Sequence, residues 1–252
     1  MAGSSSTPGK PESSQFLFRF PAQAVYSFES FIETPPSSFA LSAARDLIDN
    51  PEAPFQSLFI FGRRGAGKTH LLMAMGNEAS NNGQDTLYIS CKEWVEKLNS
   101  AAPEQGLEWA SEVSRHQLLL MDDVDTLAGA PQAQEILYQV YNTIRENGDR
   151  LVLTSQVAPG QFQETESYLT SRFQWGLTAE IGPLDEKSQA SVLAKLGRDR
   201  GLELTERVLH FLVQRLPRDY PSLKNAIEKI NIESLRQKKK VSLPLIKSVL
   251  DF

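Results

Sequence analysis

The sequence predicts an α/β fold in which helices flank a parallel β-sheet and a wholly helical region follows it. Three observations support this prediction. An apolar segment runs straight into a glycine-rich loop and then into a helical pattern at residues 58–79. A second apolar segment, residues 118–123, ends in two aspartates. Strand and helix patterns alternate up to Pro183, and beyond it the pattern is helical.

The glycine-rich loop is a complete P-loop, with the sequence GRRGAGKT at residues 62–69. Its glycines let backbone N–H groups turn inward around an anion, and the next helix, predicted over 70–79, directs its positive end at the same charge. Lys68 can reach terminal phosphates, and Thr69 can hold Mg²⁺. The residues predicted to contact ATP or ADP are Gly62, Arg63, Arg64, Gly65, Ala66, Gly67, Lys68, Thr69 and His70.

The apolar segment LLLMDD at residues 118–123 fits a Walker B element, the acidic half of a nucleotide site. Asp122 is expected to order the water shell of Mg²⁺, which makes it a metal-site residue together with Thr69. Asp123 is expected to orient the attacking water. An alternative is that the two aspartates only cap a turn after the strand. The P-loop upstream favours the nucleotide site.

The remaining elements follow from hydrophobic periodicity and from capping and stop signals. The pattern predicts a helix over 39–49, a strand over 86–90, helical structure over 92–116 broken near Pro103, a helix over 132–147 stopped by Gly148, and a strand over 151–155. In the C-terminal region it predicts four helices, at about 185–200, 205–216, 221–237 and 242–251.

Composition restricts the class of protein. At 252 residues and 40% apolar content the chain can bury one good core and a small second domain. A net charge of −5 gives no general positive field that would attract nucleic acid. The single cysteine, Cys91, excludes an internal disulfide and is expected to be a packed residue. No signal peptide or membrane-spanning run is visible, so the cytoplasm is the expected location.

Four segments together resemble one protein family. They are GKTHLLMAMGN at 67–77, LLLMDDVDTLAG at 118–129, LVLTS at 151–155 and SRFQWGLT at 171–178. In this order, and followed by a helical lid, they resemble the AAA+ ATPases and, within them, the DnaA family of replication initiators. The resemblance runs from about residue 24 to the C-terminus. It implies an AAA+ P-loop core over 24–182 and a helical lid over 183–252.

The family resemblance assigns further roles. Arg172, in the motif Ser-Arg-Phe-x-Trp-Gly, falls where the family keeps an arginine finger that is offered to the γ-phosphate of a neighbouring subunit. Phe31 and Ile32 fall where the adenine ring is expected. The resemblance also implies the DnaA initiator as a partner. An Arg172 that only supports a turn is the alternative.

Several positions depart from the family pattern. The arginine of the lid that contacts nucleotide aligns with Pro221, and the arginine four residues before the finger aligns with Tyr168. The aspartate after Thr-Ser is Gln156. Basic residues that grip single-stranded DNA in initiators fall on Ala130 and Gln132. The sequence also stops with the lid, so sequence-specific DNA binding is not expected.

Residues 1–23 are predicted to be a flexible lead that carries a possible recognition peptide. The short DnaA-like regulators without a DNA-binding domain carry an N-terminal peptide for the DNA polymerase sliding clamp, and residues 15–20 resemble it. The residues concerned are Gln15, Phe16, Leu17, Phe18 and Phe20. A first strand or a cover over the protein's own core is the alternative.

Three functions remain open from sequence. The first is a nucleotide-binding regulator of replication initiation that acts on DnaA through Arg172 in trans, with weak intrinsic ATPase activity at most. The second is an autonomous AAA+ ATPase of the initiator or helicase-loader type, which self-assembles and hydrolyses ATP. The third is the excised AAA+ domain of a full initiator. A homo-oligomer is a further possible partner state.

Overall fold

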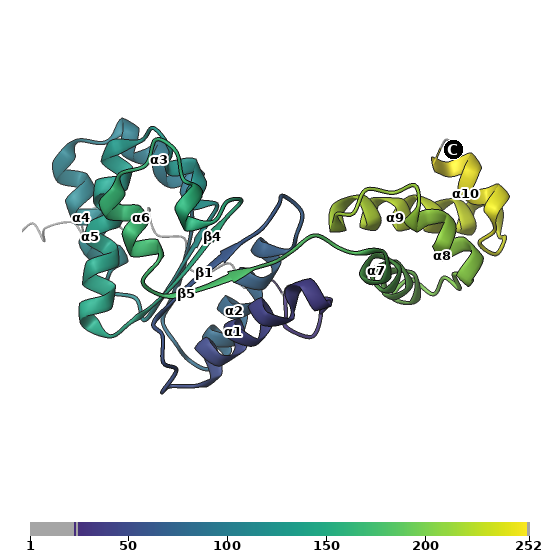
Figure 1. Ribbon diagram of the computed structural model, residues 1–252, viewed down its shortest axis with the longest axis horizontal. Coiled ribbons are helices and arrows are strands. Elements are labelled where there is room, and N and C mark those ends of the chain that lie inside the picture. Colours follow the sequence, from purple (N-terminus) through teal and green to yellow (C-terminus); the bar gives the residue numbers. More distant parts are fainter. Residues whose placement is uncertain (1–22, 24, 251–252) are drawn as a thin grey trace, which may run out of the picture.

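A computed structural model of the chain describes residue 23 and residues 25–250. Its centre is a five-stranded, all-parallel sheet (Figure 1) with the order β2-β3-β4-β1-β5. The strands are β1 (Ser57–Phe61), β2 (Thr86–Ser90), β3 (Leu118–Asp122), β4 (Arg150–Ser155) and β5 (Leu177–Glu180). The predicted parallel sheet is therefore confirmed.

Helices cover both faces of this sheet, because alternate side chains of each strand point to opposite sides. Leu58 and Ile60 of β1 pack against α1 (Ser38–Asp49) and α2 (Lys68–Asn81), whereas Phe59 between them points to the other face. That second face is covered by α3 (Cys91–Ser100), α4 (Pro103–Val113), α5 (Pro131–Asn147) and α6 (Ser167–Phe173). The result is a three-layer α/β/α core.

The lid is a separate layer of four helices: α7 (Glu186–Arg198), α8 (Glu206–Val213), α9 (Tyr220–Gln237) and α10 (Leu243–Leu250). They enclose their own apolar cluster, which includes Leu193, Leu212, Leu223 and Ile227. An extended segment leads from β5 to α7, and Figure 1 shows the lid beyond the end of the sheet. Among the described residues, no helix is both long and apolar enough to cross a bilayer.

Two elements were not predicted from the pattern. Helix α6 and strand β5 lie between the last predicted strand and the lid, where the sequence was read only as a family motif. Three short 3₁₀ turns in the described part of the chain, including η3 (Val124–Leu127), were also not predicted. The other predicted strands and helices are present and differ at their ends by three residues or fewer. The predicted break near Pro103 is also present, because α3 ends at Ser100 and α4 begins at Pro103.

Candidate nucleotide-binding site

The P-loop connects the carboxyl end of β1 to α2. Gly65 and Gly67 have φ angles of 80° and 104°, values in the left-handed region that favours glycine. A side-chain carbon at Gly67 would lie 3.2 Å from the ring of Phe31, so this ring leaves little room for a side chain there. Helix α2 begins at Lys68, so its free N–H groups face the loop.

Lys68 is buried at 6% exposure, which is unusual for a lysine. Its Nζ donates to the carbonyl oxygens of Gly62 at 2.9 Å and Arg63 at 3.4 Å. No described carboxylate forms an ion pair with it. A buried ammonium with only neutral partners is suited to an anion, and a nucleotide phosphate fits that requirement.

Asp122 lies at the end of β3 and is buried among hydroxyl groups. Its Oδ2 accepts hydrogen bonds from Thr69 Oγ1 at 2.8 Å and from the Tyr88 hydroxyl at 3.2 Å, and its Oδ1 accepts one from Thr154 Oγ1. The predicted metal pair, Thr69 and Asp122, is thus in direct contact. Carboxylate and hydroxyl oxygens are ligands that Mg²⁺ accepts, so the pair could hold this ion through its water shell.

Asp123 follows in a left-handed conformation, with φ 55°. Its backbone N–H donates to Thr154 Oγ1 at 2.9 Å. Burial raises the pKa of the Asp123 carboxyl above its ordinary value, and the charge of Asp122 raises it further, while Lys68 acts in the opposite direction. A carboxyl with a raised pKa beside the P-loop could act on water.

The segment before α1 lies beside the first turn of α2. The rings of Tyr26 and Phe31 contact the His70 imidazole edge to face, with centroids 5.1 and 5.5 Å away, and Ser30 Oγ lies 3.1 Å from its Nε2. Burial lowers the pKa of His70. Ile32 packs instead on the apolar cluster of the lid. Phe31 and Ile32 therefore lie between the P-loop and the lid, a position compatible with the predicted adenine contact.

The lid reaches the P-loop through the start of α9. The Tyr220 N–H donates to the Gly65 carbonyl at 3.3 Å, and a side-chain carbon at Gly65 would lie 3.0 Å from Pro221. Proline is tolerated in a first helical turn but offers no charge to a phosphate. Gln156 donates through its backbone and side chain to Asp125, at 2.9 and 3.3 Å.

Arg172 is held by neutral groups on its own chain. Its Nε donates to Asn142 Oδ1 at 3.0 Å, and one terminal nitrogen donates to the Tyr138 hydroxyl at 3.2 Å. Its guanidinium carbon lies 3.6 Å from the centre of the Trp175 ring, a stacking distance. Trp175 itself is 50% exposed. The guanidinium is thus fixed at the surface of the core.

This arginine lies near the end of the sheet opposite the P-loop. Leu177 pairs with Leu58 at the start of β1, and a side-chain carbon at Gly176 would overlap Ser57. The P-loop begins at Gly62, five residues after Ser57 along β1. At about 3.3 Å per residue, this distance is roughly 16 Å. Tyr168 stands where the family pattern has an arginine, and its hydroxyl donates a hydrogen bond to Glu135 at 3.2 Å.

The structure thus brings the P-loop, Thr69, Asp122, Asp123, His70 and Phe31 together around one end of the sheet and leaves Arg172 at the other. Sequence reasoning missed Thr154 and Tyr88 as partners of Asp122, and Trp175 as the surface on which Arg172 stacks. Thr154 had a usable signal, because polar residues at the carboxyl ends of neighbouring parallel strands meet. The peptide at residues 15–20 lies outside the described residues.

A parallel sheet with a P-loop after one strand, an acidic pair after another and a helical lid over the loop defines an AAA+ ATPase domain. Residues 22–180 match the family described as the bacterial DnaA ATPase domain, and residues 185–250 match the family described as the Hda lid domain. The chain belongs to the DnaA family, and its lid is of the Hda type.

Relatives and solved structures agree with this assignment. The replication initiator DnaA of Flavobacterium psychrophilum is 32% identical over 232 residues, which cover 90% of this chain and 48% of the relative. Domain III of DnaA from Thermotoga maritima superposes with a TM-score of 0.82 at 31% identity, covering 92% of this chain and 98% of that domain. AMPPCP-bound DnaA from Aquifex aeolicus gives 0.79 at 27% identity, covering 86% and 69%. The chain spans about half the length of the curated relatives it matches.

Proposed function

We propose that this protein is a nucleotide-binding regulator of replication initiation that acts on the initiator DnaA. Its own P-loop binds ADP or ATP, and Arg172 reaches the ATP held by a neighbouring DnaA subunit. The family assignment supports the replication context, because the full-length relatives are replication initiators. The lid family supports a regulator of the Hda type.

The observation that carries this proposal is the position of Arg172. The guanidinium stacks on Trp175 near the end of the sheet opposite the P-loop, so it cannot act on the nucleotide of its own subunit. Its hydrogen-bond partners are an amide and a hydroxyl, which leave its charge available. A planar, fixed and permanently charged group at a surface is the form in which an arginine stabilises phosphoryl transfer in a partner.

The nucleotide site itself supports binding better than turnover. Lys68 and the loop N–H groups would hold the phosphates, and Thr69 with Asp122 would hold Mg²⁺. Phosphoryl transfer needs stabilisation of developing negative charge around the transferred group. Pro221 brings no charge to the loop, and Gln156 is engaged by Asp125. This site therefore fits the role of a nucleotide-dependent docking element.

The test is ATP hydrolysis by full-length DnaA with and without this protein. Arg172→Ala should remove the stimulation of DnaA, since arginine fingers contribute about 10³- to 10⁵-fold in rate, and should leave nucleotide binding to this protein's own P-loop unchanged. Arg172→Lys should restore little, because an ammonium cannot reproduce the planar fork.

Arg115, an exposed arginine in the turn after α4, offers a matched control, and Arg115→Ala should stimulate DnaA as well as the parent does. If Arg172→Ala also stimulates like the parent, the protein does not act through an arginine in trans. Rapid ATP hydrolysis by the isolated protein would favour the autonomous ATPase instead.

We further propose that residues 15–20 bind the DNA polymerase sliding clamp. The alternating bulky side chains after Gln15 suit an extended peptide in an apolar groove. Replacing Gln15 and Phe18 with alanine should weaken clamp binding in a pull-down and leave the melting temperature unchanged. A lower melting temperature with unchanged clamp binding would show instead that the segment packs on the protein's own core.

A further inference from the structure

Arg172 shares the ring of Trp175 with a second arginine. Arg145, in the last turn of α5, has its guanidinium carbon 4.4 Å from the centre of the Trp175 ring, compared with 3.6 Å for Arg172. Both distances end at one point, so the two guanidinium carbons lie at most 8.0 Å apart, the sum of the two values. Two permanent positive charges therefore lie against one half-exposed indole.

Neither of these charges is neutralised within the described part of the chain. Arg172 bonds to neutral groups, and Arg145 forms no ion pair with a described residue. Asp149 lines the same pocket but is not within ion-pair distance of Arg145. In a protein of net charge −5, two adjacent unpaired arginines form a local positive site that would be stabilised by an anion from outside.

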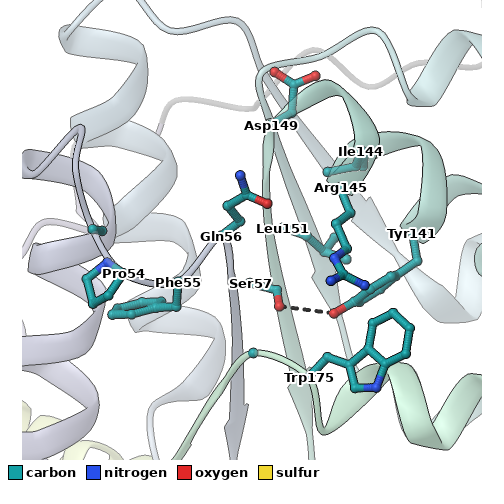
Figure 2. A pocket seen from close by; sticks show the side chains of 12 residues that line it. Pro54, Phe55, Gln56, Ser57, Tyr141, Ile144, Arg145, Asp149, Leu151 and Trp175 are labelled. Atoms are coloured by element: carbon teal, nitrogen blue, oxygen red, sulfur yellow. Dashed lines mark hydrogen bonds between the residues drawn. The ribbon is translucent and has the colours of Figure 1, made fainter.

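A cavity of about 290 Å³ adjoins Arg145 and offers room for such an anion. Figure 2 shows the Arg145 side chain extending from α5 toward the indole of Trp175, with Tyr141 beside them and the start of β1 on the other side. The Ser57 and Tyr141 hydroxyl groups, which both line the cavity, bond to each other at 3.0 Å between β1 and α5. A water molecule takes about 30 Å³ in the liquid, so the cavity can take a hydrated phosphate group.

We propose that Arg145 is a second anion-binding residue of the trans site and contacts the polyphosphate of the nucleotide held by the partner subunit. This inference rests on the proposed function of Arg172. Stacking on the indole uses the face of each guanidinium and leaves N–H groups at its edges free to donate. Arg145 then supplies a second charge from the last turn of α5.

The experiment is ATP hydrolysis by full-length DnaA stimulated with single variants of this protein. Arg145→Ala should lower the maximal stimulated rate by about 10- to 100-fold, the effect of losing one charge-assisted hydrogen bond. Arg145→Lys should recover part of that loss, since a lysine keeps the charge. The matched control is Arg207→Ala, which removes an exposed arginine of α8 in the lid and should have no effect.

A double variant separates contact with the anion from support of Trp175. If Arg145 contacts the polyphosphate, Arg145→Ala lowers the rate further in a Trp175→Ala background; if it acts only through the indole, it has no additional effect there and the inference is overturned. A loss of stimulation with Arg172→Ala but none with Arg145→Ala would overturn this inference and leave the proposed function in place. Full stimulation by both single variants would overturn both.

Discussion

At the scale of single residues, the site is built from charged groups whose partners on the chain are neutral. Lys68 bonds to two carbonyl oxygens, and Asp122 accepts from three hydroxyl groups. Neutral partners hold each side chain in place without cancelling its charge. Each group is therefore oriented before ligand binds, which lowers the entropy cost of binding.

The first prediction concerns Lys68. Lys68→Ala should weaken ADP binding by about 100-fold or more, because charge-assisted hydrogen bonds to phosphate contribute about 1.5–3 kcal/mol each. The fold should persist, since the ammonium has no ionic partner whose charge would be left buried. Calorimetric titration with ADP checks the affinity, and circular dichroism checks the fold. Lys229→Ala in α9 is the control, and an unchanged ADP affinity for Lys68→Ala would refute the assignment of the loop.

The second prediction uses the raised pKa of Asp123. Folding disfavours the charged form of this carboxyl, so in the nucleotide-free protein the group lowers the free energy of unfolding at pH 7. As the pH falls through the raised pKa, the carboxyl becomes protonated in the folded protein and this destabilisation is lost. Asp123→Asn should therefore raise the melting temperature at pH 7.5, and the gain should shrink toward pH 4. An amide also tolerates the left-handed backbone, but that benefit does not change with pH. A gain that is constant between pH 7.5 and 4 would rule out the electrostatic cause.

At the scale of elements, the sequence predicted those strands that are continuous apolar runs. Strands β1 and β3 are buried on both faces, so each is a continuous run of apolar residues in the sequence. Turn residues border each run, and a short bounded apolar run indicates a buried strand. Strand β5 is an edge strand of four residues with mixed polarity, and α6 has seven residues, so neither has a strong periodic signal. They matter for the site because the turn between them carries Trp175.

The site could be predicted only where its residues are adjacent in the chain. The P-loop, which includes Lys68 and Thr69, and the Asp122–Asp123 pair are both local motifs. Each could therefore be identified from a short stretch of sequence. Two other contacts, by contrast, join residues from different elements. In one the lid packs on Gly65, and in the other two arginines lie against one indole. No local pattern encodes such contacts, because they depend on how the helices are placed on the sheet.

The third prediction follows from the first turn of α9 and the end of β4. With Pro221 on Gly65 and Gln156 bonded to Asp125, the loop lacks two groups that usually stabilise the transferred phosphoryl group. The isolated protein should bind ATP but hydrolyse it far more slowly than the roughly 10 s⁻¹ that is the median for enzymes. Release of phosphate under single-turnover and multiple-turnover conditions measures this. A turnover near that median would contradict the regulatory function.

At the scale of the whole molecule, the nucleotide site joins two independent cores. The P-loop belongs to the sheet, whereas α9 belongs to the helical lid with its own apolar cluster. Among the described residues, the direct bonds between the two near the loop include one from the Tyr220 N–H to the Gly65 carbonyl. Another, at 3.4 Å, runs from Lys195 to the Glu29 carbonyl. A ligand that contacts both sides therefore adds to the coupling between them.

The fourth prediction concerns this coupling. ADP at about 100 times its dissociation constant should add about 2.7 kcal/mol to the free energy of unfolding, which for a chain of this size is a rise of about 5–10 °C in melting temperature. Differential scanning calorimetry should show lid and core unfolding in one transition when ADP is bound. Lys68→Ala should lose the shift. A lid transition that stays separate and unmoved by ADP would show that the nucleotide contacts the core alone.

The parallel sheet also gives the molecule a direction. Its strands all point the same way, so the P-loop end and the Arg172 end are chemically unlike faces. When the arginine face of one chain contacts the P-loop face of another, the interface is heterologous. The first chain then keeps a free P-loop face, and the second keeps a free arginine face. A chain that gives its arginine face to DnaA therefore occupies the P-loop end of a row of subunits, and its own P-loop becomes the new outward end of that row.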